Sequence, residues 1–135
     1  MRTIILAGLL LLGTSPVLAQ DEANDCENAV AQQDMNICAH QDFEAADAEL
    51  NAVWKKARAA AKAMDADYEE AMRGADKALV AGQRGWIAYR DGRCELAGWD
   101  AHGGSMEPML VSGCMADMTR ARTKELREFI EGDQQ

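Results

Sequence analysis

Four cysteines are the residues with the clearest potential for chemistry, which is disulfide formation or metal binding: Cys26, Cys38, Cys94 and Cys114. A structural zinc site usually needs thiolate pairs that are two to four residues apart, and these cysteines are not spaced in that way. Their even number, in a chain with an export signal, favours disulfides. Of the three possible pairings we favour Cys26–Cys38 and Cys94–Cys114, because each pair spans a predicted helix junction and closes a short loop.

A second set of residues could bind copper, because thioethers with one imidazole suit Cu(I). The set consists of one histidine and four methionines: His102, Met106, Met109, Met115 and Met118. Met115 and Met118 also fit the apolar face of the last predicted helix, where methionine is a common core residue. We therefore predict no metal and no cofactor, and keep copper binding as an alternative. Tight copper binding that Met106→Leu abolishes would support that alternative.

The sequence does not contain an arrangement typical of an enzyme. It has no Ser–His–Asp order, no metal-ligand histidine pair and no phosphate-binding loop. His40 and His102 are isolated, and the acidic residues are scattered over every polar face, so no catalytic carboxylate pair can be identified. We predict that the protein is not an enzyme and has no catalytic residues.

The N-terminus is typical of an export signal. Arg2 precedes an apolar run from Ile4 to Leu12, and Val17 and Ala19 occupy the −3 and −1 positions of a signal-peptidase site before Gln20. The apolar run is too short to remain as a membrane anchor, and no lipidation cysteine follows the site. The sequence therefore predicts a signal peptide at residues 1–19 and a periplasmic or secreted product without a membrane anchor.

Composition predicts the fold class and excludes some partners. The chain has only two prolines and is rich in residues that favour helix, so we expect an all-α fold in a single domain, residues 20–135. Removal of Arg2 with the signal peptide changes the formal net charge from −9 to −10. A chain this acidic repels nucleic acid and anionic lipid, and it attracts basic partners.

The apolar pattern predicts four helices. A short helix covers Asn28 to Gln32, and a long helix capped by Asp34 continues to about Met64. The next is capped by Asp65 or Asp67, ends near Gly98, and has an inward stripe of seven residues: Tyr68, Met72, Ala75, Leu79, Gly82, Trp86 and Tyr89. Ser105 caps the last helix, which ends at Gly132. We expect a small antiparallel bundle of two long helices, a C-terminal helix and the short N-terminal helix, stapled by two disulfides.

Several polar residues fall within these stripes, and we expect them to be structural. They are Asp47, Asn51, Arg90, Asp91 and Arg122. Arg122 is four residues from both Met118 and Leu126, so its side chain points with the apolar face. A buried guanidinium needs a carboxylate partner, for which Asp47 and Asp91 are the candidates. We predict a polar network that sets the register between helices.

The ordered series of motifs resembles the LprI-type lysozyme-inhibitor N-terminal domain family. The resemblance extends from Cys26 to about Leu126 and rests on four segments: Asp47-x-x-Leu50-Asn51; Gln83-Arg84-x-Trp86-x-x-Tyr89-Arg90-Asp91-x-x-Cys94; Gly103-Gly104; and Cys114-x-x-x-x-Thr119-x-x-Arg122-x-x-x-Leu126. It implies a secreted or envelope-attached helical domain that, in at least one member, inhibits lysozyme. The lipidation cysteine of that member is absent here, so membrane attachment is not implied.

The loop before the last helix is the candidate for binding a partner. Lysozymes are commonly basic and have a cleft with two carboxylates, which a protruding loop could fill. The candidate residues are Trp99, His102 and Ser105, with Trp99 as an anchor. Burial of Trp99 against the helix ends is the alternative. We expect the partner to be lysozyme or another basic peptidoglycan hydrolase. If it is another hydrolase, the protein would be an immunity-type module. The sequence does not determine the oligomeric state.

Overall fold

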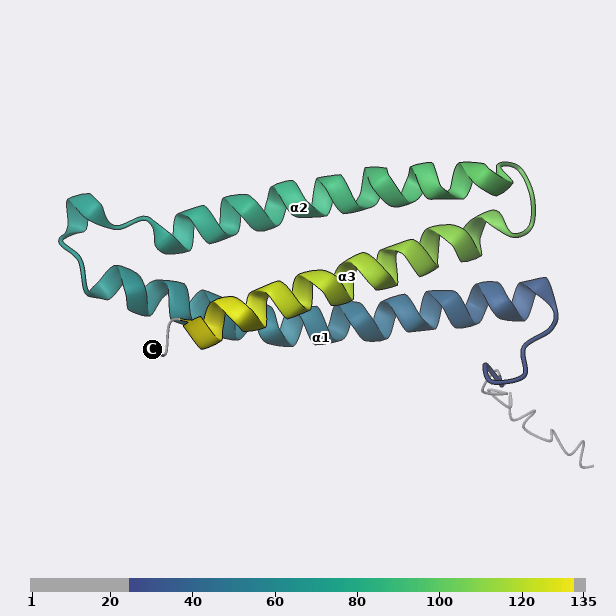
Figure 1. Ribbon diagram of the computed structural model, residues 1–135, viewed down its shortest axis with the longest axis horizontal. Helices are drawn as coiled ribbons and strands as arrows, with labels where there is room; N and C mark the ends of the chain where they lie inside the picture. The colour runs from purple at the N-terminus through teal and green to yellow at the C-terminus, as the bar shows by residue number, and fades with distance from the viewer. Residues whose placement is uncertain (1–24, 133–135) are drawn as a thin grey trace, which may run out of the picture.

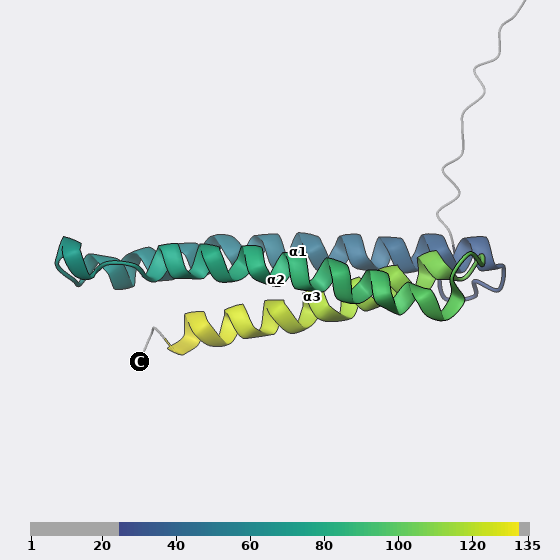
Figure 2. The ribbon, with the colours of Figure 1, turned by 90° about the horizontal axis from the view of Figure 1, so that it is seen from above.

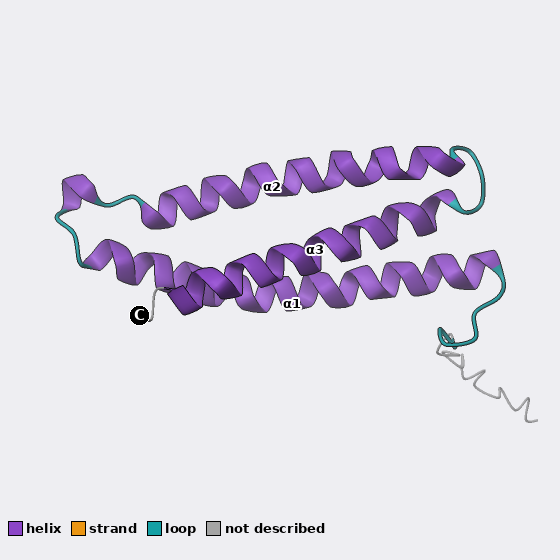
Figure 3. Cartoon of the chain, viewed as in Figure 1, coloured by secondary structure: helices purple, strands orange, loops and turns teal. Residues whose placement is uncertain are grey.

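The described part of the protein is a bundle of three long helices. The computed structural model describes residues 25–132, so the predicted signal peptide at residues 1–19 lies outside the described residues. The helices are α1 (Gln32–Ala66), α2 (Ala75–Gly98) and α3 (Glu107–Gly132), with short 3-10 turns at Glu70–Met72 and Trp99–Ala101. Residues 25–132 contain no strand (Figure 3). The predicted all-α, disulfide-stapled bundle is confirmed.

The three helices lie along one another in an up-down-up order. Figure 1 shows α1 and α3 running in one direction and α2 in the other. The most extensive packing joins α3 to α1, α3 packs less extensively on α2, and α1 and α2 touch least. Seen from above, the second half of α3 diverges from α2 (Figure 2). As a result α3 supports α2 mainly near the C-terminal end of α2, whereas near the N-terminal end Asp76 pairs with Arg58 of α1.

The core is small because α1 faces α3 largely with alanines. The buried positions of α1 recur every three or four residues: Ala46, Leu50, Val53, Ala57 and Ala61. Three of them form a cluster with Leu126 of α3, and five partly buried residues pack around it: Trp54, Leu79, Trp86, Phe129 and Ile130. Small side chains allow the helix axes to approach closely, but they bury little apolar surface. Covalent links therefore matter to this fold.

The predicted helix at Asn28 to Gln32 is wrong. Residues 25–31 form a turn, in which the N–H of Asn28 donates to the carbonyl of Asp25, and α1 begins at Gln32. Asp34 lies in the first turn of α1 instead of capping it. The physical reason is the disulfide, which holds the Cα atoms of Cys26 and Cys38 5.5 Å apart. Twelve residues of continuous helix would separate them by about 18 Å, so the chain must reverse before Gln32.

The α1–α2 junction also differs from the prediction. α1 continues through Asp65 to Ala66, and α2 begins only at Ala75. Asp65 does cap α2, but from the last turn of the preceding helix: its carboxylate accepts the backbone N–H groups of Gly74, Ala75 and Asp76 at 2.7, 2.8 and 3.1 Å. These bonds, led by that from Gly74, hold the pKa of Asp65 below its usual value. Because the Asp65 carboxylate accepts these N–H groups across the turn, it fixes the direction of α2 relative to α1.

The inward stripe predicted for α2 is wrong at four of its seven positions. Tyr68 and Met72 precede the helix and are exposed, and Gly82 and Tyr89 face solvent. The buried residues of α2 are instead Gln83, Arg90, Cys94 and Gly98. Polar side chains occupy the inward face because partners on α1 and α3 satisfy them, and apolar periodicity cannot detect such positions.

The start of α3 is shifted by one residue from the prediction, and α3 extends to Gly132, the last residue that the structure describes. The carbonyl of Met106, and not Ser105, accepts the first helical bond, from the N–H of Leu110. Pro108 occupies the first turn, where its missing N–H is not needed. Two ion pairs, Arg120 with Asp42 and Arg127 with Glu49, join α3 to α1 along the bundle.

Candidate functional site

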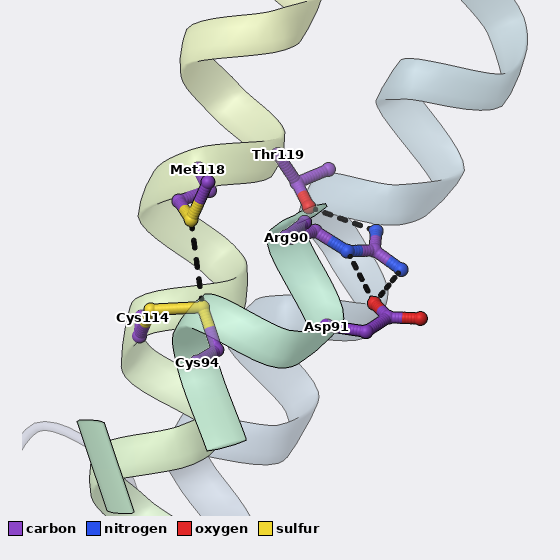
Figure 4. Close-up of a disulfide and its surroundings, with 6 residues drawn as sticks. All are labelled: Arg90, Asp91, Cys94, Cys114, Met118 and Thr119. Atoms are coloured by element: carbon purple, nitrogen blue, oxygen red, sulfur yellow. Dashed lines mark hydrogen bonds and ion pairs between the residues drawn. A yellow bond between two sulfur atoms is a disulfide. The ribbon is translucent and has the colours of Figure 1, made fainter. Parts of the chain in front are cut away.

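Both disulfides lie in the same half of the bundle, and both have the predicted pairing. Cys26–Cys38 ties the turn at residues 25–31 to the first turns of α1. Cys94–Cys114 joins the last turn of α2 to the first half of α3, with the Cα atoms 5.4 Å apart. Figure 4 shows this second bond between the two helices, with the sulfur of Met118 3.6 Å from Sγ of Cys94. The α2–α3 connection at this end is therefore held by a covalent bond.

The charge of the molecule is divided between its two halves. We call residues 25–49 and 94–119 the acidic half: they include both disulfides and carry eleven Asp and Glu but no Lys or Arg. The other described residues carry nine Asp and Glu and all thirteen described Lys and Arg. Residues 25–49 precede α3 by more than fifty positions, so only the bundle brings the two segments of the acidic half together (Figure 1).

The predicted loop presents Trp99 at the surface. Its side chain is 59% exposed, so the alternative of burial is not what the structure has. The indole stacks on the imidazole of His102, with the ring centroids 4.2 Å apart and the planes 5° from parallel. Nδ1 of His102 lies 3.1 Å from Oε1 of Glu107. An exposed aromatic ring is thus supported from behind by a second ring.

Glu107, which the sequence analysis did not select, organises this loop. Its Oε2 accepts the N–H of Gly103 at 2.8 Å, and this bond, with the contact to His102, lowers the pKa of Glu107. Gly103 adopts φ +74°, which favours glycine. The signal in the sequence is an acidic residue in the first turn of a helix, where it can accept free N–H groups.

Two further contacts hold the loop in place. Gly98 lies so close to α3 that a Cβ there would be 2.7 Å from Cγ2 of Val111, so only glycine allows this approach. Ser105 contributes its backbone: its carbonyl accepts the side-chain amide of Asn36, on α1, at 2.9 Å. Of the predicted loop residues, Trp99 and His102 therefore lie together, and Ser105 links the loop to α1.

Four of the five predicted network residues meet around Arg90, which is 7% exposed. Its guanidinium donates to Asp91 at 2.9 Å and lies 3.6 Å from Asp47, which in turn accepts from Asn51. It also donates to Thr119, which is fully buried on α3 (Figure 4). Thr119 belongs to the family motif that begins at Cys114. Because it is uncharged, the sequence alone does not mark it as a partner of a buried arginine.

The carboxylate partner predicted for Arg122 is wrong. Arg122 donates to Gln83 at 3.0 Å and to Glu125 at 2.8 Å, and not to Asp47 or Asp91. Its guanidinium carbon lies 6.0 Å from the centre of the Trp86 ring, and that of Arg90 lies 5.1 Å from the same ring. Arg122 therefore joins the network through an aromatic ring that both guanidiniums approach.

The residues proposed for copper have separate contacts. The sulfur of Met109 accepts from Gln32, that of Met118 approaches the disulfide, and His102 faces Glu107. Within residues 25–132 no group of three or more His, Cys, Asp or Glu side chains could hold a metal ion. The structure supplies no observation that favours copper binding.

Fold and site together define an acidic three-helix protein with a disulfide-stapled end. The chain belongs to the lysozyme inhibitor LprI family, whose model matches residues 23–126. It is 56% identical over 126 residues to an uncharacterized protein of Rhizobium meliloti (strain 1021), covering 91% of each chain. No solved structure matches. The family is one of inhibitors, and it indicates lysozyme as the kind of partner. None of the helices described here is long and apolar enough to cross a membrane.

Proposed function

We propose that this protein, exported after removal of residues 1–19, binds and inhibits lysozyme or a related basic peptidoglycan hydrolase through its acidic half. The observation that carries the proposal is that eleven Asp and Glu lie in the acidic half, at the same end of the bundle as the exposed Trp99. Four of these carboxylates pair with arginines of the other half: Asp42, Asp47, Glu49 and Asp117. The family supports lysozyme as the target, and two disulfides suit an oxidising compartment outside the cytoplasm.

The separation of charge gives the encounter a direction. A basic hydrolase is attracted to the half with eleven carboxylates and is not attracted to the half where basic residues outnumber acidic ones. Such steering raises the association rate and orients the two proteins before they touch. It also predicts that salt weakens inhibition, because ions screen charges that are exposed and separated.

Trp99 provides the local contact. Large aromatic residues are frequent anchors in protein interfaces, and a ring that is already held loses little conformational freedom on binding. His102 and Glu107 hold the loop in the free protein, so it need not be ordered by the partner.

The first experiment is lysis of bacterial cell walls by a basic lysozyme, with increasing amounts of the purified, oxidised protein. We expect stoichiometric inhibition by the wild type and at least a roughly tenfold weaker inhibition by Trp99→Ala. Tyr68→Ala is the matched control, because Tyr68 is also an exposed aromatic residue, 54% exposed, but lies at the other end of the bundle.

The outcomes separate the possible partners. Equal inhibition by Trp99→Ala and the wild type would remove this loop from the interface. No inhibition of lysozyme at any ratio would overturn lysozyme as the target. A panel of basic peptidoglycan hydrolases then tests the alternative of an immunity-type module, for which the same acidic half would serve.

A further inference from the structure

The solvent-facing side of α2 lacks the charged residues expected of an exposed helix face. In Figure 1, α2 lies along one edge of the bundle, with α1 and α3 both to the same side of it. Six exposed residues recur along α2 at alternating spacings of four and three: Ala78, Gly82, Gly85, Tyr89, Gly92 and Leu96. We call them the outer stripe. It carries no charge, although 27% of the residues in the whole chain are charged.

The outer stripe is exposed along its whole length in the isolated bundle. Tyr89 and Leu96 are each 63% exposed. A Cβ added at Gly82, Gly85 or Gly92 would meet nothing within 4 Å, so packing within the chain does not require glycine at these positions. Glycine is also among the poorest helix formers. Three glycines in one stripe with two exposed large residues, on a helix that could carry alanine or lysine, indicate a surface that another helix approaches closely.

The order of residue sizes along the stripe points to a second copy of the same helix. Small residues occupy its first half, and the large ones, Tyr89 and Leu96, its second half. In an antiparallel pair related by a two-fold axis near residue 87, Tyr89 faces Gly85 of the second copy and Leu96 faces its Ala78. Both large side chains then lie over small ones, and Gly82 faces Gly92, which is the self-complementarity that a two-fold interface requires.

The charges at the edge of the stripe agree with this pairing. Lys77 and Glu95 are eighteen residues apart, which is five helical turns, so they lie on the same side of α2 about 27 Å apart. Both are exposed, and neither belongs to an ion pair within residues 25–132. The antiparallel pairing brings Lys77 of each copy level with Glu95 of the other, within reach of a long side chain. Two symmetric ion pairs would then flank the apolar contact.

We propose that this protein forms an antiparallel homodimer through the outer stripe of α2. The geometry leaves the two acidic halves at opposite ends of the dimer. One helix face, about 36 Å long for 24 residues, covers less than the roughly 800 Å² per partner of a standard interface. We therefore expect a dissociation constant in the micromolar range and a dimer that depends on concentration.

The test is the molar mass of the purified, oxidised protein by sedimentation equilibrium, over a range of concentrations up to roughly 1 mM. We expect dimers in the wild type and monomers throughout for Gly85→Glu, which places two carboxylates at the centre of the interface. The monomer of this variant should fold, because the new side chain meets open space and glutamate favours helix more than glycine does. Ala48→Glu, at an exposed position of α1, adds the same charge away from the stripe and should leave the dimer intact.

A charge swap tests whether the molecule that binds the outer stripe is a second copy of this chain. Lys77→Glu and Glu95→Lys should each weaken the dimer at least about tenfold, since either change brings like charges together at both symmetric sites. The double variant should restore it, which is the result expected only if both residues belong to the same interface.

Three results would overturn the proposal: a wild type that stays monomeric, a Gly85→Glu variant that dimerises like the wild type, or a double swap that is no better than the single variants. A monomeric wild type whose inhibition of lysozyme is lost in Gly85→Glu would assign the stripe to the hydrolase. Because the mass is measured without any hydrolase, failure here leaves the proposed function untouched.

Discussion

Two arginines that are largely shielded from solvent lie against one tryptophan. Trp86 is in contact with the guanidiniums of both Arg90 and Arg122, which come from α2 and α3. Each guanidinium is also hydrogen-bonded to neutral or acidic partners, so its burial leaves no donor group stranded within the described residues. Such a cluster specifies how two helices align, because a shift along the axis would break several directional contacts at once.

Arg122→Ala tests this role at the scale of one residue. The change removes the partner of Gln83, which is 7% exposed, and one cation from the face of Trp86. We expect the melting temperature of the oxidised protein to fall by about 5 °C, because a buried polar group is left unsatisfied. Arg84→Ala is the control, since Arg84 is on the same helix as Gln83 but exposed. An unchanged melt would show that the contact does not contribute to stability.

Asp65 links stability to pH. Its pKa is lower in the folded protein than in the unfolded chain because it accepts N–H groups, first that of Gly74. The stability it contributes is therefore complete above the unfolded pKa of about 3.9 and is lost as pH falls through the lower folded value. Asp65→Ala should lower the melting temperature at pH 7 by about 5 °C.

Asp65→Asn separates the two contributions of this residue. Asparagine keeps an oxygen that can cap the helix but cannot titrate. We expect this variant to remain close to the wild type at pH 7 and to lose less stability than the wild type between about pH 4 and pH 2. Parallel acid unfolding curves for the two proteins, followed by circular dichroism, would contradict the assignment.

At the scale of the elements, the two disulfides have different tasks. Cys26–Cys38 closes a loop of 12 residues and holds a segment that lies outside the helices, whereas Cys94–Cys114 closes one of 20 residues and holds α2 to α3. Chain entropy alone gives both bonds about 3 kcal/mol. Their effects on the fold should differ nevertheless, because α2 buries few apolar side chains of its own.

The corresponding prediction compares two double variants. Cys94→Ser with Cys114→Ser should lower the melting temperature by more than 10 °C, roughly the effect of 3 kcal/mol in a domain of this size, and should loosen α2. Cys26→Ser with Cys38→Ser should be less damaging, leaving α1 helical and exposing residues 25–31 to proteases. Amide hydrogen exchange along α2 and limited proteolysis are the measurements. Equal protection of α2 in both variants would contradict the difference in roles.

At the scale of the whole molecule, the separation of charge governs the proposed encounter with a hydrolase. Inhibition should weaken as salt rises from about 0.05 to 0.3 M, because the Debye length falls from roughly 14 Å to roughly 6 Å and ions screen the exposed charges more strongly. Asp34→Asn with Asp100→Asn should reduce inhibition at low salt, as both lie in the acidic half. Asp67→Asn with Glu69→Gln removes the same charge from the other half and is the control. Equal effects of the two pairs would mean that only net charge matters.

The sequence by itself determined the features that depend on composition and local spacing. The helical class follows from residues that favour helix and from the scarcity of proline, and the loop before α3 follows from Gly103 and Gly104. The disulfide pairing could be predicted because each pair closes a short loop across a junction. Trp99 and His102 could be selected because they lie in the one clear loop.

Only the tertiary structure decided which side of α2 faces inward. Apolar periodicity favoured Gly82 and Tyr89, yet the bundle buries Gln83 and Arg90, because Arg122, Thr119 and Asp47 on the other helices satisfy their polar groups. The same holds for the reversal before α1, which the disulfide imposes, and for Asp65, which caps a helix nine residues ahead of it. These features depend on contacts between separate segments of the chain, whereas helix propensity and apolar periodicity depend only on residues that are close together in the sequence.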